Sequence, residues 1–289
     1  MRIASVYTGG AEKACILEGG SLFTVESISR RTGRDWPAGL QEILEGDLFG
    51  DVAGWYAGEG GLPSGLESDL SADGALFVPP YRRPGKIWGI GLNYREHADE
   101  LCEKCPEGEP GSFMKPFTTV IGHGDTIQIP PQSEKTTAEA ELGVIIGRKC
   151  IDIEEADWLD DVAGFTTVLD MTAEDILLRN VRYLTRCKSF DTFFSFGPVI
   201  VTPDELEDIE ALEVSTVLNG EIRARNTVSN MTFKPAALVA VHSQSTTLLP
   251  GDIISTGTPG AVVISGGDVA ECRITGFPSL VCDVAAQGR

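Results

Sequence analysis

The chain has 289 residues, of which 42% are hydrophobic, so it can form one large domain or a small domain beside a larger one. Its formal net charge of −20 excludes the broad basic surface that nucleic-acid binding needs and disfavours attraction to anionic membranes. No run of about 18 apolar residues predicts a transmembrane helix, and the first residues, MRIASVYTGG, lack the apolar core of a signal peptide.

Seven cysteines are scattered along the chain, which favours reduced thiols in a cytoplasmic protein over a disulfide framework. Cys102 and Cys105 form the one Cys-x-x-Cys pair. A zinc site would need a second pair of Cys or His ligands, and none is evident. The following PEGEPG sequence makes a surface segment the simpler interpretation of this pair.

The first part of the chain predicts a small N-terminal domain over residues 1–78. Residues 2–7 (RIASVY) indicate a strand, and residues 13–26 indicate a hairpin with Gly19-Gly20 in its turn. Residues 36–46 (WPAGLQEILEG) predict a short helix. The Pro79-Pro80 pair marks the expected boundary, and residues 79–289 form the larger part.

The larger part contains many short β-like segments and fewer helical ones, which predicts a β-rich α+β fold without regular βαβ alternation. The expected strands cover residues 86–92, 126–130, 141–150, 163–172, 196–202, 213–222, 252–257 and 268–274. The expected helices cover residues 93–102, 153–162, 173–185 and 235–245. The Gly89-x-Gly91 turn lacks the third glycine of a dinucleotide-binding fingerprint.

Three carboxylates stand in strand-like surroundings. Glu139 and Glu141 are two residues apart, so a strand would project both from one face, where the like charges repel unless a cation neutralises them. Asp170 lies within the apolar run FTTVLDMT and needs a partner there. A solvated strand face and a helix cap are the simpler alternatives. All-oxygen ligation would favour Mg²⁺, Mn²⁺ or Ca²⁺ over zinc.

His97 and Glu100 would share one face if residues 93–102 form a helix. A histidine beside a carboxylate can move protons, because the carboxylate orients the imidazole and supports its cation. A helix surface pair without a role is the alternative. Lys115 and Lys188 each lie among aromatic and apolar residues, which predicts partial burial and a use in stabilising an oxyanion. The alternative for each is a surface lysine whose stem is partly covered.

Residues 248–262 (LLPGDIISTGTPGAV) form a turn-rich segment carrying Thr256 and Thr258. Its backbone N–H groups and hydroxyls could bind a carboxylate, and a plain strand and loop is the alternative.

These motifs, in this order, resemble the fumarylacetoacetate hydrolase family. The similar blocks cover roughly residues 86 to 275 and include KIWGIGLNYREHADE, FMKPFTTVIGHGDTIQIP, AEAELGVIIGRKC, VAGFTTVLDMTAED, CKSFDTFFSFGPVIVT, VLNGEIRARNTVSNMTF and LLPGDIISTGTPGAV. The resemblance implies a rolled mixed β-sheet domain, usually dimeric, so we expect a homodimer.

The resemblance also assigns site residues. It implies Mg²⁺ or Mn²⁺ bound by Glu139, Glu141 and Asp170. The family's His–Glu dyad, its two active-site lysines and its substrate contacts fall on His97 and Glu100, on Lys115 and Lys188, and on Arg95, Gly257 and Thr258.

The function that the resemblance implies is metal-dependent hydrolysis of a C–C bond in a small 2-oxo acid such as an acylpyruvate. The metal would chelate the substrate and stabilise an enolate, and the dyad would activate water. An oxaloacetate-type decarboxylase, a keto–enol or cis–trans isomerase, and a non-catalytic binding protein are the alternatives. Thr137, Glu174 and Ala224 depart from the family pattern, which we interpret as altered substrate preference in a working enzyme.

Overall fold

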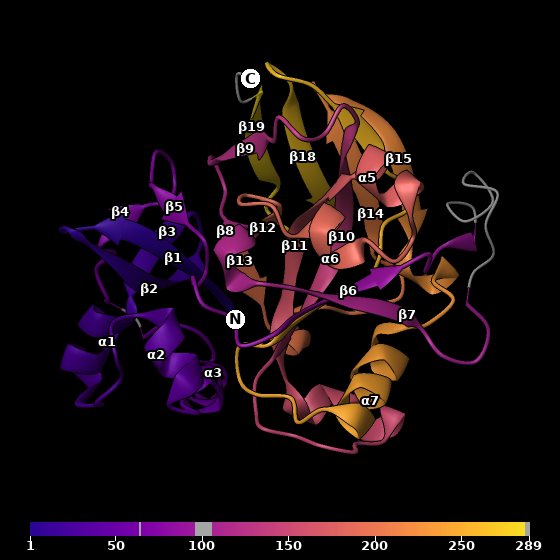
Figure 1. The fold of residues 1–289 in the computed structure, drawn as a ribbon. Helices are drawn as coiled ribbons and strands as arrows, with labels where there is room; N and C mark the ends of the chain where they lie inside the picture. Colours follow the sequence, from indigo (N-terminus) through magenta and orange to yellow (C-terminus); the bar gives the residue numbers. More distant parts are fainter. Residues whose placement is uncertain (64, 96–105, 287–289) are drawn as a thin grey trace.

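The computed structural model describes residues 1–63, 65–95 and 106–286, and Figure 1 shows an N-terminal unit beside a larger, strand-rich body. The strands of the N-terminal unit are β1 (Arg2–Thr8), β2 (Ala11–Glu18), β3 (Ser21–Thr24), β4 (Leu70–Ser71) and β5 (Phe77–Val78). Its helices are α1 (Val25–Thr32), α2 (Leu40–Glu45) and α3 (Phe49–Gly58).

Local sequence explains how this unit folds. The β2–β3 hairpin turns at Gly19 and Gly20, which have φ values of 58° and 78° that favour glycine. The side chain of Thr24 accepts a hydrogen bond from the Ser27 N–H and so caps α1, which ends at Gly33 in the left-handed conformation. The helices bury apolar side chains such as Ile28 and Leu44 in one core cluster with strand residues.

The larger body contains the remaining strands and three α-helices within the described part of the chain. The strands are β6 (Ile87–Gly91), β7 (Gly111–Lys115), β8 (Val120–Ile121), β9 (Thr126–Ile129), β10 (Thr136–Ile146), β11 (Val162–Ala173), β12 (Phe194–Phe196), β13 (Val199–Val201), β14 (Glu213–Leu218), β15 (Glu221–Thr227), β16 (Ile253–Ser255), β17 (Val262–Ile264), β18 (Val269–Ile274) and β19 (Leu280–Ala286). The helices are α5 (Glu174–Arg179), α6 (Leu184–Lys188) and α7 (Pro235–Ser245).

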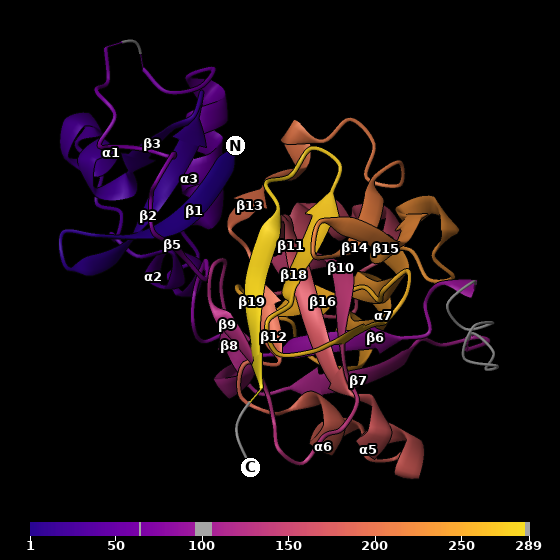
Figure 2. The ribbon, with the colours of Figure 1, turned by 90° about the horizontal axis from the view of Figure 1, so that it is seen from above.

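The strands form one large mixed sheet and one smaller sheet. The path of the large sheet runs β4-β3-β2-β1-β13-β11-β10-β16-β6-β7, with parallel pairing between β16 and β6. The smaller sheet runs β15-β14-β18-β19-β9. Figures 1 and 2 show β14, β18 and β19 over the long strands β10 and β11. Side chains of both sheets, among them Leu142, Leu169, Val214 and Cys272, share one buried cluster.

The two longest strands, β10 and β11, lie at the centre of the molecule. Every residue of both strands is buried, including the threonines and acidic residues that stand among their apolar side chains. They pair antiparallel with Glu139 directly opposite Asp170. This register brings three acidic side chains of the two strands into the core.

The β-rich α+β fold predicted from the sequence is confirmed, and two predicted helices differ in detail. Residues 173–185, expected as one helix, form α5 and α6 with an Asn180–Tyr183 connection between them. Residues 153–162, expected as an α-helix, instead contain the 3₁₀ helix Glu155–Asp161, which has no buried residue. Of this 3₁₀ helix only Trp158 packs against the main core cluster, where its ring contacts Phe165, so the apolar face that would stabilise a longer helix is small.

Pairing of β1 with β13 carries the large sheet across the predicted boundary at residue 79. Arg2, Ile3 and Ala4 lie opposite Val201, Ile200 and Val199. The division into residues 1–78 and 79–289 stays a prediction. Among the described residues, no helix is long and apolar enough to cross a membrane.

Candidate metal centre

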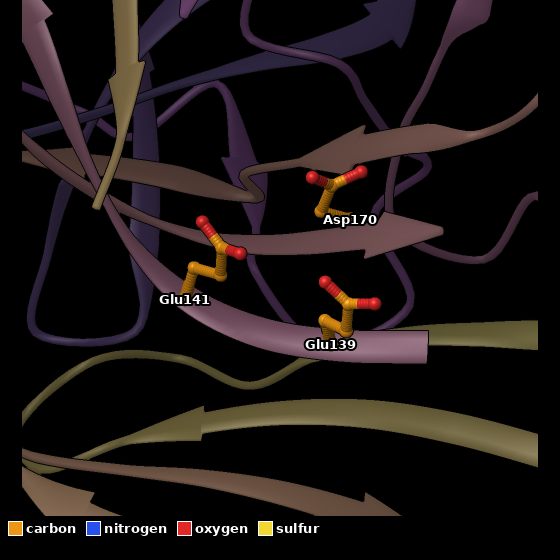
Figure 3. A group of neighbouring side chains, drawn as sticks. All are labelled: Glu139, Glu141 and Asp170. Carbon is orange, nitrogen blue, oxygen red and sulfur yellow. The ribbon is translucent and has the colours of Figure 1, made fainter. Parts of the chain in front are cut away.

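Glu139, Glu141 and Asp170 gather in the core of the large sheet. Figure 3 shows the two glutamates on β10 and the aspartate on the neighbouring β11. One carboxylate oxygen of each lies within 4.8 Å of one oxygen of each of the others. Their exposed fractions are only 9%, 1% and 0%, so water screens the three negative charges weakly.

Two buried lysines face this carboxylate triad (Glu139, Glu141 and Asp170). The Lys188 Nζ atom lies 2.9 Å from Glu139 Oε2 and 3.0 Å from Asp170 Oδ2. The Lys115 Nζ atom donates to Asp170 Oδ1 and to the Met171 carbonyl oxygen. β7 ends at Lys115 and α6 at Lys188, so two further elements converge on the triad.

The charges in this cluster shift one another's pKa values. Burial opposes the charge on Lys188, but the three nearby carboxylates outweigh it and raise the pKa of its ammonium group. Burial lowers the pKa of Lys115, which has Asp170 as its nearest carboxylate. Burial, reinforced by repulsion from Asp170, raises the pKa of Glu141 to about 8. Near neutral pH a Glu141 carboxyl with this pKa is therefore largely protonated.

Neutral donors orient the two glutamates. Glu139 Oε1 accepts hydrogen bonds from the hydroxyls of Thr172 at 2.6 Å and Thr137 at 3.1 Å. Glu141 Oε2 accepts from the Ser255 hydroxyl at 2.5 Å and from the Gly257 N–H at 2.9 Å. Outer hydrogen bonds of this kind fix the rotamer of a ligating carboxylate and raise its affinity for a metal.

Aromatic rings cover the two ammonium groups. The Phe113 ring centroid lies 4.8 Å from Lys188 Nζ, and the Phe194 centroid lies 5.9 Å from Lys115 Nζ. Such rings attract a cation electrostatically and keep water away from it. They therefore preserve the low dielectric that strengthens every charge interaction in the site.

The residues present fit a hard divalent cation. Three carboxylates offer oxygen ligands only, which is the donor type of Mg²⁺ and Mn²⁺ sites. When all three carboxylates are ionised, the triad carries one more negative charge than the two lysines neutralise. A divalent cation would offset that excess and so favour the ionised form of Glu141, whose pKa is raised chiefly by burial.

The structure brings together five of the residues singled out in the sequence: Glu139, Glu141, Asp170, Lys115 and Lys188. Both lysines are more deeply buried than expected, with exposed fractions of 3% and 5%. The Gly257 N–H is directed at Glu141, and the Thr258 hydroxyl closes a local turn with Gly260. Arg95 is exposed. The catalytic and substrate-binding roles of these residues stay predictions.

The predicted His97–Glu100 dyad and the Cys102–Cys105 pair lie outside the described residues. The sequence analysis did not find Ser255 and Phe113, whose partners in the site lie far along the chain. The Ser255–Glu141 hydrogen bond, for example, joins positions 114 residues apart. The only available signal was position, because Ser255 directly precedes the Thr256-Gly257-Thr258 turn.

Comparisons with known proteins show what the chain is similar to. Rat "Oxaloacetate tautomerase Fahd2a, mitochondrial" is 38% identical over 206 residues, which cover 68% of this chain and 66% of the rat protein. The match thus spans slightly less than two thirds of that relative.

Two solved structures match over the full length, so that each match covers 100% of this chain and 100% of the chain in that structure. Maleylpyruvate hydrolase from Sphingobium sp. SYK-6, in complex with manganese(II) ion and pyruvate, is 26% identical with a TM-score of 0.80. The 5-carboxymethyl-2-hydroxymuconate delta-isomerase from Mycobacterium smegmatis is 27% identical with a TM-score of 0.77.

The family model described as the C-terminal domain of fumarylacetoacetate (FAA) hydrolase matches residues 86–285, which include all five residues of the buried cluster. The resemblance drawn from the sequence motifs is therefore confirmed, and the chain belongs to the fumarylacetoacetate hydrolase family of enzymes.

Proposed function

We propose that this chain is a divalent-metal-dependent tautomerase that interconverts the keto and enol forms of oxaloacetate or a closely similar 2-oxo diacid. The observation that carries the proposal is the buried carboxylate triad with two lysines against it. The choice of reaction is supported by the rat tautomerase, which is 38% identical over the region that includes this site.

The reaction moves one proton and changes no other atom. A proton leaves carbon 3 of the diacid and another is added to the oxygen of the 2-oxo group, through an enolate. A cation such as Mg²⁺ or Mn²⁺, held by Glu139, Glu141 and Asp170, would supply Lewis-acid stabilisation of negative charge on that oxygen.

The chain's own contribution is a fixed electrostatic environment. Lys115 and Lys188 place two positive charges against the triad, beneath the rings of Phe194 and Phe113. Charges held in place before the reaction stabilise developing negative charge without the cost of reorganising solvent. With a divalent cation bound, the site would carry a net positive charge, which favours an anionic substrate in a chain whose net charge is −20.

Proton transfer is assigned in this proposal to the sequence-predicted dyad His97 and Glu100. A neutral imidazole can take a proton from carbon, and a neighbouring carboxylate can stabilise the cation that forms. Arg95 and the Thr256–Thr258 turn would contact the carboxylates of the diacid.

Hydrolysis of a C–C bond in an acylpyruvate-like substrate is the second candidate. It is favoured by the likeness to maleylpyruvate hydrolase, which extends over the whole of both chains and so includes the N-terminal unit. The two reactions would share the enolate-stabilising site. They differ in whether the dyad moves a proton of the substrate or activates a water molecule.

Product analysis distinguishes the candidates. Purified protein with Mn²⁺ or Mg²⁺ would be given enol-oxaloacetate, acetylpyruvate and maleylpyruvate in separate NMR tubes. For a tautomerase we expect keto-oxaloacetate to form faster than in a metal-only sample, with no new carbon skeleton. Acetate and pyruvate from acetylpyruvate would instead support the hydrolase. Pyruvate and bicarbonate from oxaloacetate would indicate a decarboxylase.

The controls test the site itself. Glu141→Gln should abolish turnover, whereas Glu12→Gln, which changes a carboxylate paired with the exposed Arg82 in the N-terminal unit, should not. Tautomerisation that persists in EDTA and in Glu141→Gln would overturn the proposed function.

A further inference from the structure

The peptide group between Thr256 and Gly257 is bound at both ends. Its carbonyl oxygen, on Thr256, accepts a hydrogen bond of 2.8 Å from Asn93 Nδ2. Its N–H, on Gly257, donates to Glu141 Oε2 at 2.9 Å. One planar unit therefore connects the side chain of Asn93 to a carboxylate of the candidate metal centre.

We propose that Asn93 is a positioning residue that fixes this peptide in the orientation in which it holds Glu141. The proposal rests on the metal site of the proposed function and adds a residue that does not itself touch the metal or the substrate.

Asn93 is held firmly enough to act in this way. Its side chain is buried, with an exposed fraction of 1%. Its amide group also donates to the Phe233 carbonyl at 2.9 Å and accepts from the Phe233 N–H at 2.8 Å, while its own carbonyl accepts from the Thr232 N–H at 2.7 Å. These bonds fix which side of the Asn93 amide faces Thr256, because only the nitrogen side can donate.

Gly257 explains why the Thr256–Gly257 peptide needs the hydrogen bond from Asn93 to fix its orientation. Its φ of +94° is a conformation that glycine adopts easily, so the residue gives the preceding peptide little resistance to rotation. A Cβ atom at Gly257 would lie 2.8 Å from Asn93 Cβ, so the glycine also lets the two backbones pack closely. Because this close packing requires a glycine, the Thr256–Gly257 peptide has no Cβ atom at residue 257 to restrict its rotation.

The two orientations of the peptide differ sharply in their effect on Glu141. In the observed orientation an N–H faces the carboxylate, and the donor on Asn93 polarises the peptide so that this N–H becomes a stronger donor. In the reversed orientation a carbonyl oxygen would face the carboxylate, and the two would repel. Of the donors that the described residues give Oε2, Glu141 would then keep the Ser255 hydroxyl alone.

The test measures metal affinity and peptide orientation in variants of Asn93. Asn93→Asp keeps an acceptor for the Phe233 N–H but loses the donor to Thr256, and Asn93→Ala loses both without adding a charge. Asn230→Ala is the matched control, because Asn230 is exposed and its amide donates to Asn226. Mn²⁺ affinity would be measured by electron paramagnetic resonance, folding by thermal unfolding, and the peptide orientation in a crystal structure of Asn93→Asp.

We expect Asn93→Asp to weaken Mn²⁺ binding by about 10- to 100-fold, the usual effect of losing an outer hydrogen-bond partner. The Mn²⁺ concentration that gives half-maximal turnover should rise by the same factor, and the crystal structure should show the reversed peptide. Asn230→Ala should bind Mn²⁺ as the unchanged protein does. If Asn93→Asp does not fold, the same loss of affinity in folded Asn93→Ala supports the proposal.

A folded Asn93 variant with a lower melting temperature but an unchanged Mn²⁺ affinity would overturn the proposed positioning role, because Asn93 would then be purely structural. Unchanged protein that binds Mn²⁺ without any turnover would overturn the proposed reaction alone. Failure of the unchanged protein to bind Mn²⁺ would overturn both.

Discussion

Lys188 carries the positive charge that keeps two buried carboxylates, Glu139 and Asp170, together. Replacing it by methionine should lower the free energy of unfolding by roughly 3–5 kcal/mol, because two buried negative charges lose their common partner. Added Mn²⁺ should restore part of that loss. Urea denaturation with and without Mn²⁺ measures both effects.

Lys135→Met is the control for this prediction. Lys135 also pairs with a glutamate, at 2.8 Å, but its side chain is 45% exposed. An exposed ion pair contributes at most about 1 kcal/mol. Equal losses of stability in the two variants would contradict the role given to Lys188.

Buried thiols give a second prediction at this scale. Burial raises the pKa of Cys15, Cys272 and Cys282 to about 12, from an ordinary value of 9.0. Only the thiolate reacts with iodoacetamide. At pH 8 we therefore expect these three cysteines to be labelled only after unfolding, as peptide mass spectrometry would show.

The same shifts set the sign of a pH effect on stability. Between about pH 9 and pH 12 the unfolded chain releases thiol protons that the folded chain retains, so the free energy of unfolding should fall as pH rises. Rapid labelling of Cys272 in the native protein would contradict both expectations.

The clustering of Glu139, Glu141 and Asp170 could be predicted from the sequence, but their hydrogen-bond partners could not. Glu139 and Glu141 share a strand, and the period of two places them on one face whatever the tertiary fold. Asp170 stood out as an acid within an apolar run. Asn93 and Thr256 are 163 residues apart, and only the pairing of distant strands brings them together.

Among the elements, β6 and β7 show how a glycine shapes the site. Gly89 on β6 lies opposite Phe113 on β7, and a Cβ atom at Gly89 would lie 2.3 Å from the Phe113 ring. Gly89→Ala should therefore push the ring away from its place over Lys188. We expect kcat/KM to fall by roughly 10- to 100-fold, the scale of a small displacement in a catalytic site.

Gly91→Ala is the matched control on the same strand, since a Cβ atom there would meet its nearest neighbour at 3.9 Å, an ordinary contact. Steady-state kinetics and melting temperatures of the two variants provide the comparison. Similar activity in both would show that the position of the Phe113 ring does not matter.

Elements with a clear apolar period could be predicted, and those decided by tertiary contacts could not. The expected helix over residues 235–245 is α7, which buries Leu238 and Val239. The expected helix over residues 173–185 divides in two. Leu178 and Val181, each 70% exposed, gave that segment the apolar pattern of a buried helix without being buried.

For the whole molecule, metal binding should raise stability because the site exists only when β10 and β11 are paired. At a Mn²⁺ concentration about 100 times the dissociation constant, the gain should be about 2.7 kcal/mol. Differential scanning calorimetry would show a higher melting temperature with Mn²⁺ than with EDTA. The difference should vanish in Glu141→Gln, and its absence from the unchanged protein would count against the metal site.

The pairing of β1 with β13 also limits how this fold can be divided or recombined. A shortened chain beginning at residue 79 would leave the backbone N–H and C=O groups of one edge of β13 uncovered, with Ile200 beside them. Such an edge pairs readily with strands of neighbouring molecules. The N-terminal unit therefore cannot be exchanged for an arbitrary domain. Any domain that replaces it must also supply a strand that pairs with β13 and completes the sheet.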